Sequence, residues 1–309
     1  MYLRTFVNSI FYLCLLILTL SCKTYNEKDL AKQYYHDYKF ISIDNFEIFV
    51  IEKNLELSTK ITPIIFIHGF SSNVHTWEYY LQELGKSYPI VAFDIPGFGF
   101  SSKPEISYTR EGFVEILDKL VNYYKFNYVI LIGNSMGGEI SLRYSLKYPN
   151  KVKKLILIDS AGLIPRKELP VFLQKGVIFF AENFNFVFRN RFAISYMLKS
   201  AFYNKDVVDE RKVDLYYYPL KTAGGINAHK SLLRSTYNQI TKEEMNALQI
   251  PTLIIWGQND TWISLKYGYE FKNSLPNSQL IILPECGHVP QEEKPEESLF
   301  YIKEFIKDI

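Results

Sequence analysis

The chain has 309 residues, a net charge of +2, and 48% hydrophobic residues. This length and apolar content suit one α/β domain with an inserted subdomain and a well-buried sheet. The small net charge argues against a nucleic-acid-binding surface. Three cysteines are too few to predict a disulfide framework.

The first 22 residues predict export from the cytoplasm. Residues 1–8 carry one positive charge, Arg4, and residues 10–20 are apolar apart from Thr19. This run has the length of a signal-peptide core and is shorter than the ~20 residues that a membrane span needs. We therefore predict a signal peptide over residues 1–21.

The leader ends in residues 18–23 (LTLSCK), which resemble the cleavage box of bacterial lipoproteins. The resemblance implies that Cys22 becomes the acylated first residue of the mature protein. Thr19 stands where Leu is usual, so an uncleaved anchor and an ordinary signal peptide remain alternatives. We expect a protein of the bacterial cell envelope, either a membrane-anchored lipoprotein or periplasmic, with a polar tether over residues 22–36.

Beyond the tether, the pattern predicts one domain over residues 37–309. Residues 40–43 and 46–51 alternate between apolar and polar, which is typical of the antiparallel edge of a sheet. Fully apolar runs then alternate with helical patterns, which predicts a mostly parallel, eight-stranded sheet with helices on both faces. The apolar runs are residues 61–67, 90–93, 128–132, 155–158, 252–256 and 279–283.

Residues 163–241 break this alternation after the sixth strand. They contain apolar helical patterns at 173–188 and 192–202 and a further helix from Asn227, without a strand-like run. We predict a helical lid over the carboxyl ends of the strands. Its Phe, Tyr, Met and Leu side chains indicate an apolar acyl pocket, although packing of the lid against the domain accounts for most of them.

Residues 133–137 (GNSMG) lie between the run 128–132 and a helical pattern at 139–148. A strand, a sharp turn and a helix in this order form a nucleophile elbow. The turn presents the hydroxyl of Ser135, which is a weak nucleophile unless a base is within reach. Glycines two residues before and after the serine leave room for the turn.

Two partners for Ser135 follow at later strand ends, where parallel strands bring side chains to one edge of a sheet. Asp260 comes after the run 252–256, and His288 comes after the run 279–283. His288 is expected to act as the general base, and Asp260 to fix its tautomer and stabilise the imidazolium.

From about Phe46 onward, the chain resembles the α/β-hydrolase family. The resemblance rests on residues 66–70 (FIHGF), 94–101 (DIPGFGFS), 133–138 (GNSMGG) and the pair Asp260 and His288. It implies an oxyanion hole formed by the backbone N–H groups of Phe70 and Met136. Some members place the acid where this chain has Asp159; we favour Asp260.

Other site types lack their motifs. Gly97 and Gly99 are followed by Ser102, where a dinucleotide fingerprint needs a third glycine, and no His/Cys/Asp cluster has metal-ligand spacing. We expect no cofactor and no metal. His68 is interpreted as a residue that braces its loop, and Cys286 as a small residue packed under the His288 loop.

The sequence thus predicts a serine hydrolase that cleaves carboxylic esters of hydrophobic acyl chains through an acyl-enzyme. The expected partners are a small hydrophobic ester and, through the N-terminus, a membrane, but not a nucleic acid. One alternative is a carbon–carbon bond hydrolase of ring-fission products; that group usually has Trp after the histidine, where this chain has Val289. A non-catalytic ligand-binding protein of the same fold is a third hypothesis, disfavoured because all three triad residues are present.

Overall fold

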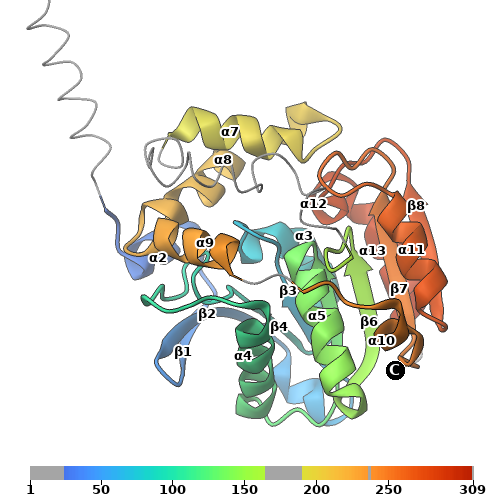
Figure 1. The fold of residues 1–309 in the computed structure, drawn as a ribbon. Coiled ribbons are helices and arrows are strands. Elements are labelled where there is room, and N and C mark those ends of the chain that lie inside the picture. Colours follow the sequence, from blue (N-terminus) through green and yellow to red (C-terminus); the bar gives the residue numbers. More distant parts are fainter. Residues whose placement is uncertain (1–23, 164–189, 236–237, 308–309) are drawn as a thin grey trace, which may run out of the picture.

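The computed structural model describes residues 24–163, 190–235 and 238–307. At its centre is one eight-stranded sheet in the order β1-β2-β4-β3-β5-β6-β7-β8 (Figure 1). Strand β2 is antiparallel to β1 and to β4, and all other neighbouring strands are parallel, which confirms the predicted sheet. The strands are β1 (Lys39–Ile43), β2 (Phe46–Lys53), β3 (Ile64–Ile67), β4 (Ile90–Phe93), β5 (Val129–Asn134), β6 (Val152–Ile158), β7 (Thr252–Gly257) and β8 (Ser278–Leu283).

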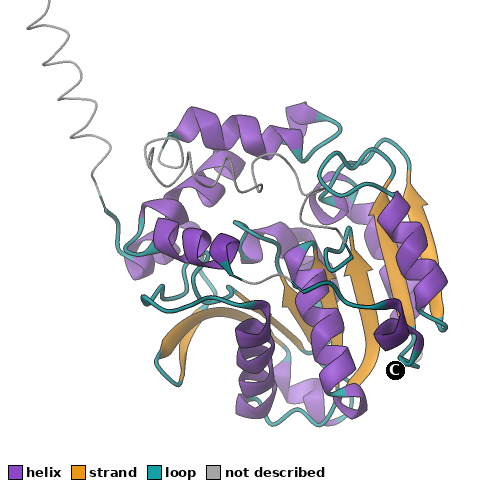
Figure 2. Ribbon diagram, in the orientation of Figure 1, coloured by secondary structure: helices purple, strands orange, loops and turns teal. Residues whose placement is uncertain are grey.

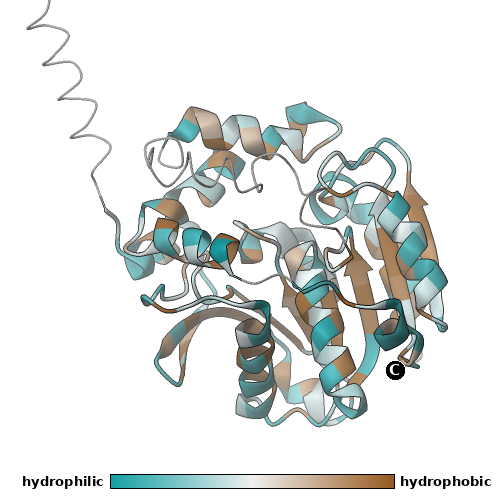
Figure 3. Ribbon diagram, in the orientation of Figure 1, coloured by the Kyte–Doolittle hydropathy of each residue, from teal (hydrophilic) through white to brown (hydrophobic). Residues whose placement is uncertain are grey.

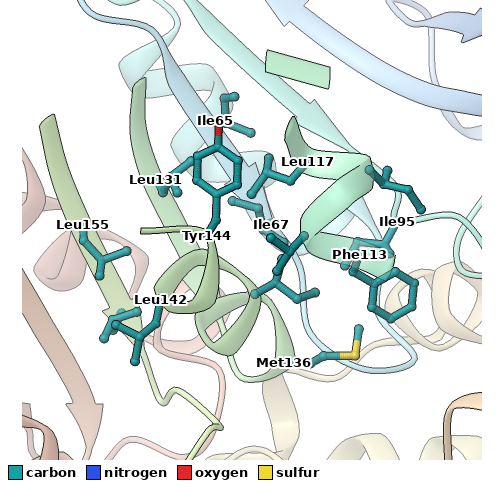
Figure 4. Close-up of a cluster of buried hydrophobic side chains, with 14 of the residues drawn as sticks. Ile65, Ile67, Ile95, Phe113, Leu117, Leu131, Met136, Leu142, Tyr144 and Leu155 are labelled. Carbon is teal, nitrogen blue, oxygen red and sulfur yellow. The ribbon is translucent and has the colours of Figure 1, made fainter. Parts of the chain in front are cut away.

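Successive side chains of the central strands enter two separate hydrophobic clusters, as the two-residue period of a strand requires. Ile65 and Ile67 of β3 lie in one cluster, whereas Ile64 and Phe66 lie in the other. Figure 4 shows part of the first cluster, and Figure 3 shows how apolar the central strands are. The sheet is therefore apolar on both faces and needs helices on both.

Helices cover the two faces of the sheet (Figure 2). Side chains of α4, α5 and α11 belong to the first cluster, and those of α3 and α13 belong to the second. The helices are α3 (Glu78–Leu84), α4 (Arg110–Tyr123), α5 (Met136–Lys147), α11 (Lys266–Ser274), α12 (Pro290–Glu293) and α13 (Pro295–Ile306).

An insertion of helices separates β6 from β7, as the sequence predicted. It contains α7 (Arg191–Ser200), α8 (Glu210–Tyr217) and α9 (Gly225–Arg234), followed by the short α10 (Lys242–Asn246). We call α7, α8 and α9 the helical cover; in Figure 1 it lies on the side to which the arrowhead of β6 points. Asn190 caps α7 by accepting two backbone N–H groups. The helix predicted at 173–188 lies outside the described residues.

The N-terminal segment is more structured than the tether that we expected. Residues Glu27–Tyr34 form helix α2, whose N-cap is Asn26 and whose Leu30 and Ala31 are buried. The N–H of Tyr25 also donates to Lys221 O at 3.1 Å, which joins this segment to the chain between α8 and α9. The few apolar residues are enough to dock a two-turn helix, although its polar surface suggested a free tether.

The predicted leader and Cys22 lie outside the described residues. Within the described ranges, no helix has the length and apolar character needed to cross a membrane.

Candidate active site

Ser135 stands at a sharp turn between β5 and α5, as the motif predicted. Its backbone has φ 55° and ψ −117°, a conformation that non-glycine residues rarely adopt. Its N–H donates to Ile158 O of the neighbouring strand at 3.0 Å, which holds the turn. A Cβ on Gly137 would lie 2.0 Å from the backbone oxygen of Ile67, and one on Gly133 would lie 2.3 Å from that of Gly137. The turn therefore requires both glycines.

His288 and Asp260 form a buried pair at the same edge of the sheet. His288 Nδ1 lies 2.7 Å from Asp260 Oδ2, and the two side chains are 3% and 0% exposed. Asp260 Oδ1 accepts the backbone N–H groups of Trp262 at 2.7 Å and Ile263 at 2.9 Å. Since Asp260 is fixed by three donors, it holds the imidazole with a proton on Nδ1 and leaves Nε2 as the free ring nitrogen.

Ser135 and His288 line one pocket together with residues of the helical cover. The pocket has a cavity volume of about 40 Å³. Its lining is mainly apolar and aromatic, and the described lining residues include neither Lys nor Arg. They are Gly69, Phe70, Ser71, Ser72, Asn134, Ser135, Ile194, Met197, Leu198, Ala201, Tyr216, Trp262, His288 and Val289.

Two further residues orient His288, and neither was predicted from the sequence. The side-chain amide of Asn134 donates to Ile158 O and to His288 O, both at 3.1 Å, and so connects the serine turn to the histidine loop. The Trp262 ring packs on the imidazole with a centroid distance of 5.0 Å. Asn134 lies inside the GNSMG motif and Trp262 lies two residues after Asp260, so both positions carried a signal.

Glu293 joins the helical cover to the histidine loop. Its carboxylate accepts the backbone N–H groups of Gly287 at 2.7 Å, Tyr203 at 3.1 Å and Asn204 at 2.5 Å. The N–H of His288 itself donates to Ala201 O at 2.7 Å. The position of the imidazole therefore depends on the segment that follows α7, a dependence that no sequence pattern indicated.

The predicted oxyanion donors lie on the two loops that border Ser135. Met136 begins α5 directly after Ser135. Phe70 follows Gly69, which lies so close to Ser135 that a Cβ added to the glycine would be 3.2 Å from Ser135 Cβ. In the described part of the chain, no hydrogen-bond acceptor is recorded for the N–H of Phe70 or of Met136. The Phe70 side chain lines the pocket, whereas the Met136 side chain is buried in the core (Figure 4).

His68 braces its loop, as we predicted. Its Nδ1–H donates to Gly69 O at 2.8 Å, and its Nε2 accepts the Ile95 N–H at 3.0 Å. Burial lowers the pKa of His68 to about 4, so the ring is neutral and both of its nitrogens are used. It positions the loop that carries Phe70.

Asp159, the rival for the acid, lies beside the pair without bonding His288. Its carboxylate comes within 4.8 Å of the ligand atoms of Asp260 and His288, and its Oδ1 accepts the Gly257 N–H at 3.0 Å. His288 Nδ1 is bonded to Asp260 instead. The geometry therefore supports Asp260 as the acid.

Three other side chains have no part in the pocket. Cys286 is fully buried, and burial raises the pKa of its thiol, so the thiol is un-ionised and inert. His75 and His229 are also buried, in polar or aromatic packing. His75 lies 3.3 Å from Glu78, and His229 packs on Phe98.

A model of the alpha/beta hydrolase fold family matches residues 62–295. The chain belongs to this family. It is a hydrolase of the α/β fold, and Ser135, Asp260 and His288 all fall within the matched residues.

Individual relatives differ in their reactions. The chain is 28% identical over 254 residues to Lipase 1 of Psychrobacter immobilis, a match that covers 79% of this chain and 76% of the lipase. It is 26% identical over 243 residues to 2-hydroxy-6-oxo-6-(2'-aminophenyl)hexa-2,4-dienoic acid hydrolase of Metapseudomonas resinovorans, covering 76% of this chain and 80% of that enzyme. The crystal structure of a membrane phospholipase A, a bacterial virulence factor, superposes with a TM-score of 0.74 and 25% identity over 99% of this chain and 98% of that one.

Proposed function

We propose that this protein is a serine hydrolase that cleaves carboxylic esters of hydrophobic acyl chains. The observation that carries the proposal is the buried 2.7 Å contact between His288 and Asp260, together with the pocket that His288 shares with Ser135 at its nucleophile elbow. Such a pair has little structural purpose unless the free ring nitrogen accepts a proton.

In the first half of the reaction, His288 Nε2 removes the proton of Ser135 Oγ as the hydroxyl attacks the ester carbonyl. Asp260 stabilises the imidazolium that forms, and the N–H groups of Phe70 and Met136 receive the charge on the carbonyl oxygen. Collapse of the tetrahedral intermediate breaks the ester bond, and His288 returns its proton to the leaving alcohol. The products are the alcohol and an acyl-enzyme on Ser135.

In the second half, water replaces the alcohol. His288 takes a proton from the water as it attacks the acyl carbonyl, and the proton then goes to Ser135 Oγ as the acid leaves. The chain needs no cofactor for either half, since the base, the acid and the oxyanion donors all come from its own residues.

The pocket lining supports a neutral, apolar substrate. Ile194, Met197 and Leu198 of α7 face the pocket, and among the described lining residues there is no cationic side chain to pair with a substrate carboxylate. A buried carboxylate without such a partner is costly. This favours an ester over the acidic substrates for which the dienoic acid hydrolases are named.

A carbon–carbon bond hydrolase of ring-fission products is the second candidate, because two relatives are named as hydrolases of 2-hydroxy-6-oxo-dienoic acids. The two are separated by assaying the purified protein with 4-nitrophenyl esters of increasing acyl length and with a 2-hydroxy-6-oxo-dienoic acid. We expect ester hydrolysis with a preference for longer acyl chains. Faster cleavage of the dienoic acid than of any ester would overturn the ester proposal.

We further propose that the protein is tethered to a membrane of the bacterial cell envelope through an acylated Cys22. Two or more acyl chains would give a lasting anchor, which one chain alone would not. Mass spectrometry of the purified N-terminus tests this: an intact Met1 or a free N-terminus elsewhere than Cys22 would contradict lipidation. Cys22→Ser should block maturation at this site without changing ester hydrolysis.

A further inference from the structure

Asp159 is a buried acid that the proposed reaction does not use. It follows β6 directly, its φ is 42°, and its side chain is fully buried. A non-glycine residue in this conformation costs free energy unless its surroundings fix it. The backbone turn directs the carboxylate toward the pair of Asp260 and His288, whose ligand atoms lie within 4.8 Å of it.

Hydrogen bonds distinguish the two neighbouring carboxylates. Asp260 accepts three donors, the N–H groups of Trp262 and Ile263 and the Nδ1–H of His288. Asp159 accepts one, the Gly257 N–H on Oδ1, and its Oδ2 is buried without a partner. Two buried carboxylates this close cannot both be ionised, and the proton goes to the one with fewer donors.

We propose that Asp159 is a positioning residue that is protonated in the resting enzyme and donates its Oδ2–H to the Asp260 carboxylate. This bond gives the unpartnered oxygen a partner and adds a fourth anchor to the acid of the triad. The effect of Asp159 on catalysis rests on the proposed function. The protonation state of Asp159 does not, because it follows from the buried geometry.

The charges around Asp159 also favour its protonated form. Burial first, and then the negative charges of Asp260 and Glu293, raise the pKa of Asp159 well above its ordinary value, against the opposing Gly257 N–H. The other titratable groups that interact with it are His288, the un-ionised thiol of Cys286 and the un-ionised Tyr80 hydroxyl.

A neutral Asp159 has a functional consequence. A second negative charge this close to His288 would stabilise its protonated form, which cannot accept the proton of Ser135. With the proton on Asp159, Asp260 carries the carboxylate charge that is bonded to the imidazole, and it is still held rigidly.

Carbon-13 NMR of the full-length protein labelled at the aspartate carboxyl carbons tests the protonation state directly. The resonance that Asp159→Asn removes should have the chemical shift of a protonated carboxyl near pH 7. A shift typical of an ionised carboxylate would overturn the proposal. This measurement needs no substrate, so it remains decisive if the ester assay of the wild type fails, which would count against the proposed function alone.

The pH profile of ester hydrolysis tests the positioning role. Asp159→Asn replaces a neutral donor by a neutral donor, so we expect kcat within about threefold of wild type and an unchanged acid limb of kcat/KM. Asp159→Ala deletes the donor and should lower kcat by roughly tenfold with little change in KM. If Asp159→Asn moves the acid limb down by about one pH unit, Asp159 is ionised in the wild type and the proposal is wrong. Equal kcat in the Ala and Asn variants would likewise exclude a positioning bond.

Discussion

The sheet edge that carries Ser135 and the helical cover above it are held in different ways. At the edge, Ser135 and Asp260 follow β5 and β7, whose side chains are all buried, and His288 follows β8, whose last side chain, Leu283, is buried. Backbone hydrogen bonds fix the turns after these strands. The cover is joined to the body partly through polar side chains, such as the ion pair of Lys212 and Glu292 at 2.6 Å. Under the proposed function, this difference means that the sheet edge supplies the catalytic groups, whereas the cover shapes the pocket that receives the substrate.

The largest effect should come from the edge. Ser135→Ala removes the nucleophile and one oxygen atom at a partly exposed turn, so it should abolish acyl-enzyme turnover and leave the fold intact. Residual catalysis from the oxyanion hole and binding would be roughly 10³ to 10⁴ above the uncatalysed rate. Ester hydrolysis is measured with circular dichroism as the folding control. A wild-type rate in this variant would show that another residue is the nucleophile.

The second effect separates the two acids at the edge. Asp260→Asn should lower kcat by about 10⁴ because the amide favours the wrong tautomer of His288. Asp159→Asn, the matched control, should lower kcat far less because His288 is not bonded to it. Steady-state kinetics of both variants decide the point, and the reverse ranking would move the acid to the end of β6.

The sequence predicted the edge well because each element there has a local signature. The two alternating segments and the six apolar runs located all eight strands, and both ends of β4 were predicted. Strand β6 begins three residues earlier than predicted, since Lys153 and Lys154 interrupted the apolar pattern. In the structure, Lys153 Nζ lies 3.9 Å from the centre of the Tyr128 ring, so the charged end stays at the surface while the backbone continues the strand.

The links between the edge and the cover could not be predicted in the same way. The bond from Asn134 to His288 joins residues 154 positions apart, and Glu293 meets Asn204 across 89 positions. Each partner is an ordinary polar residue in its own segment. Such contacts depend on how the cover packs on the body, and no local pattern in the sequence indicates that packing.

The third prediction concerns the cover. Leu198 of α7 lines the pocket and is 4% exposed, whereas Phe192 of the same helix is 81% exposed. Leu198→Ala should reduce kcat/KM for long-chain esters about 10- to 100-fold, because lost apolar contact costs about 1–3 kcal/mol. Acetyl esters should change little, and Phe192→Ala should leave both unchanged. A uniform loss across chain lengths would place the effect on the His288 loop rather than on substrate fit.

The smallest expected effect is on the pH dependence of stability, to which one buried histidine in each region contributes. Burial lowers the pKa of His68 in the body and of His229 in the cover to about 4, below the ordinary value of 6.5. As pH falls, each histidine therefore binds a proton in the unfolded chain before it does so in the folded protein. The stability that each neutral ring contributes is present above pH 6.5 and is lost as pH falls toward 4. Each contributes about 1.4 kcal/mol per pH unit to the fall in free energy of unfolding, measured by urea denaturation.

His229→Leu distinguishes the two contributions, because Nε2 of His229 has no recorded partner whereas both nitrogens of His68 are bonded. The variant should show a shallower loss of stability between pH 6.5 and 4 while keeping the hydrogen bonds that brace the Phe70 loop. The free energy of unfolding of this variant should still depend on pH, because His68 is unchanged. An unchanged slope would mean that the cover detaches before the body unfolds, so that His229 is already solvated when the sheet is lost.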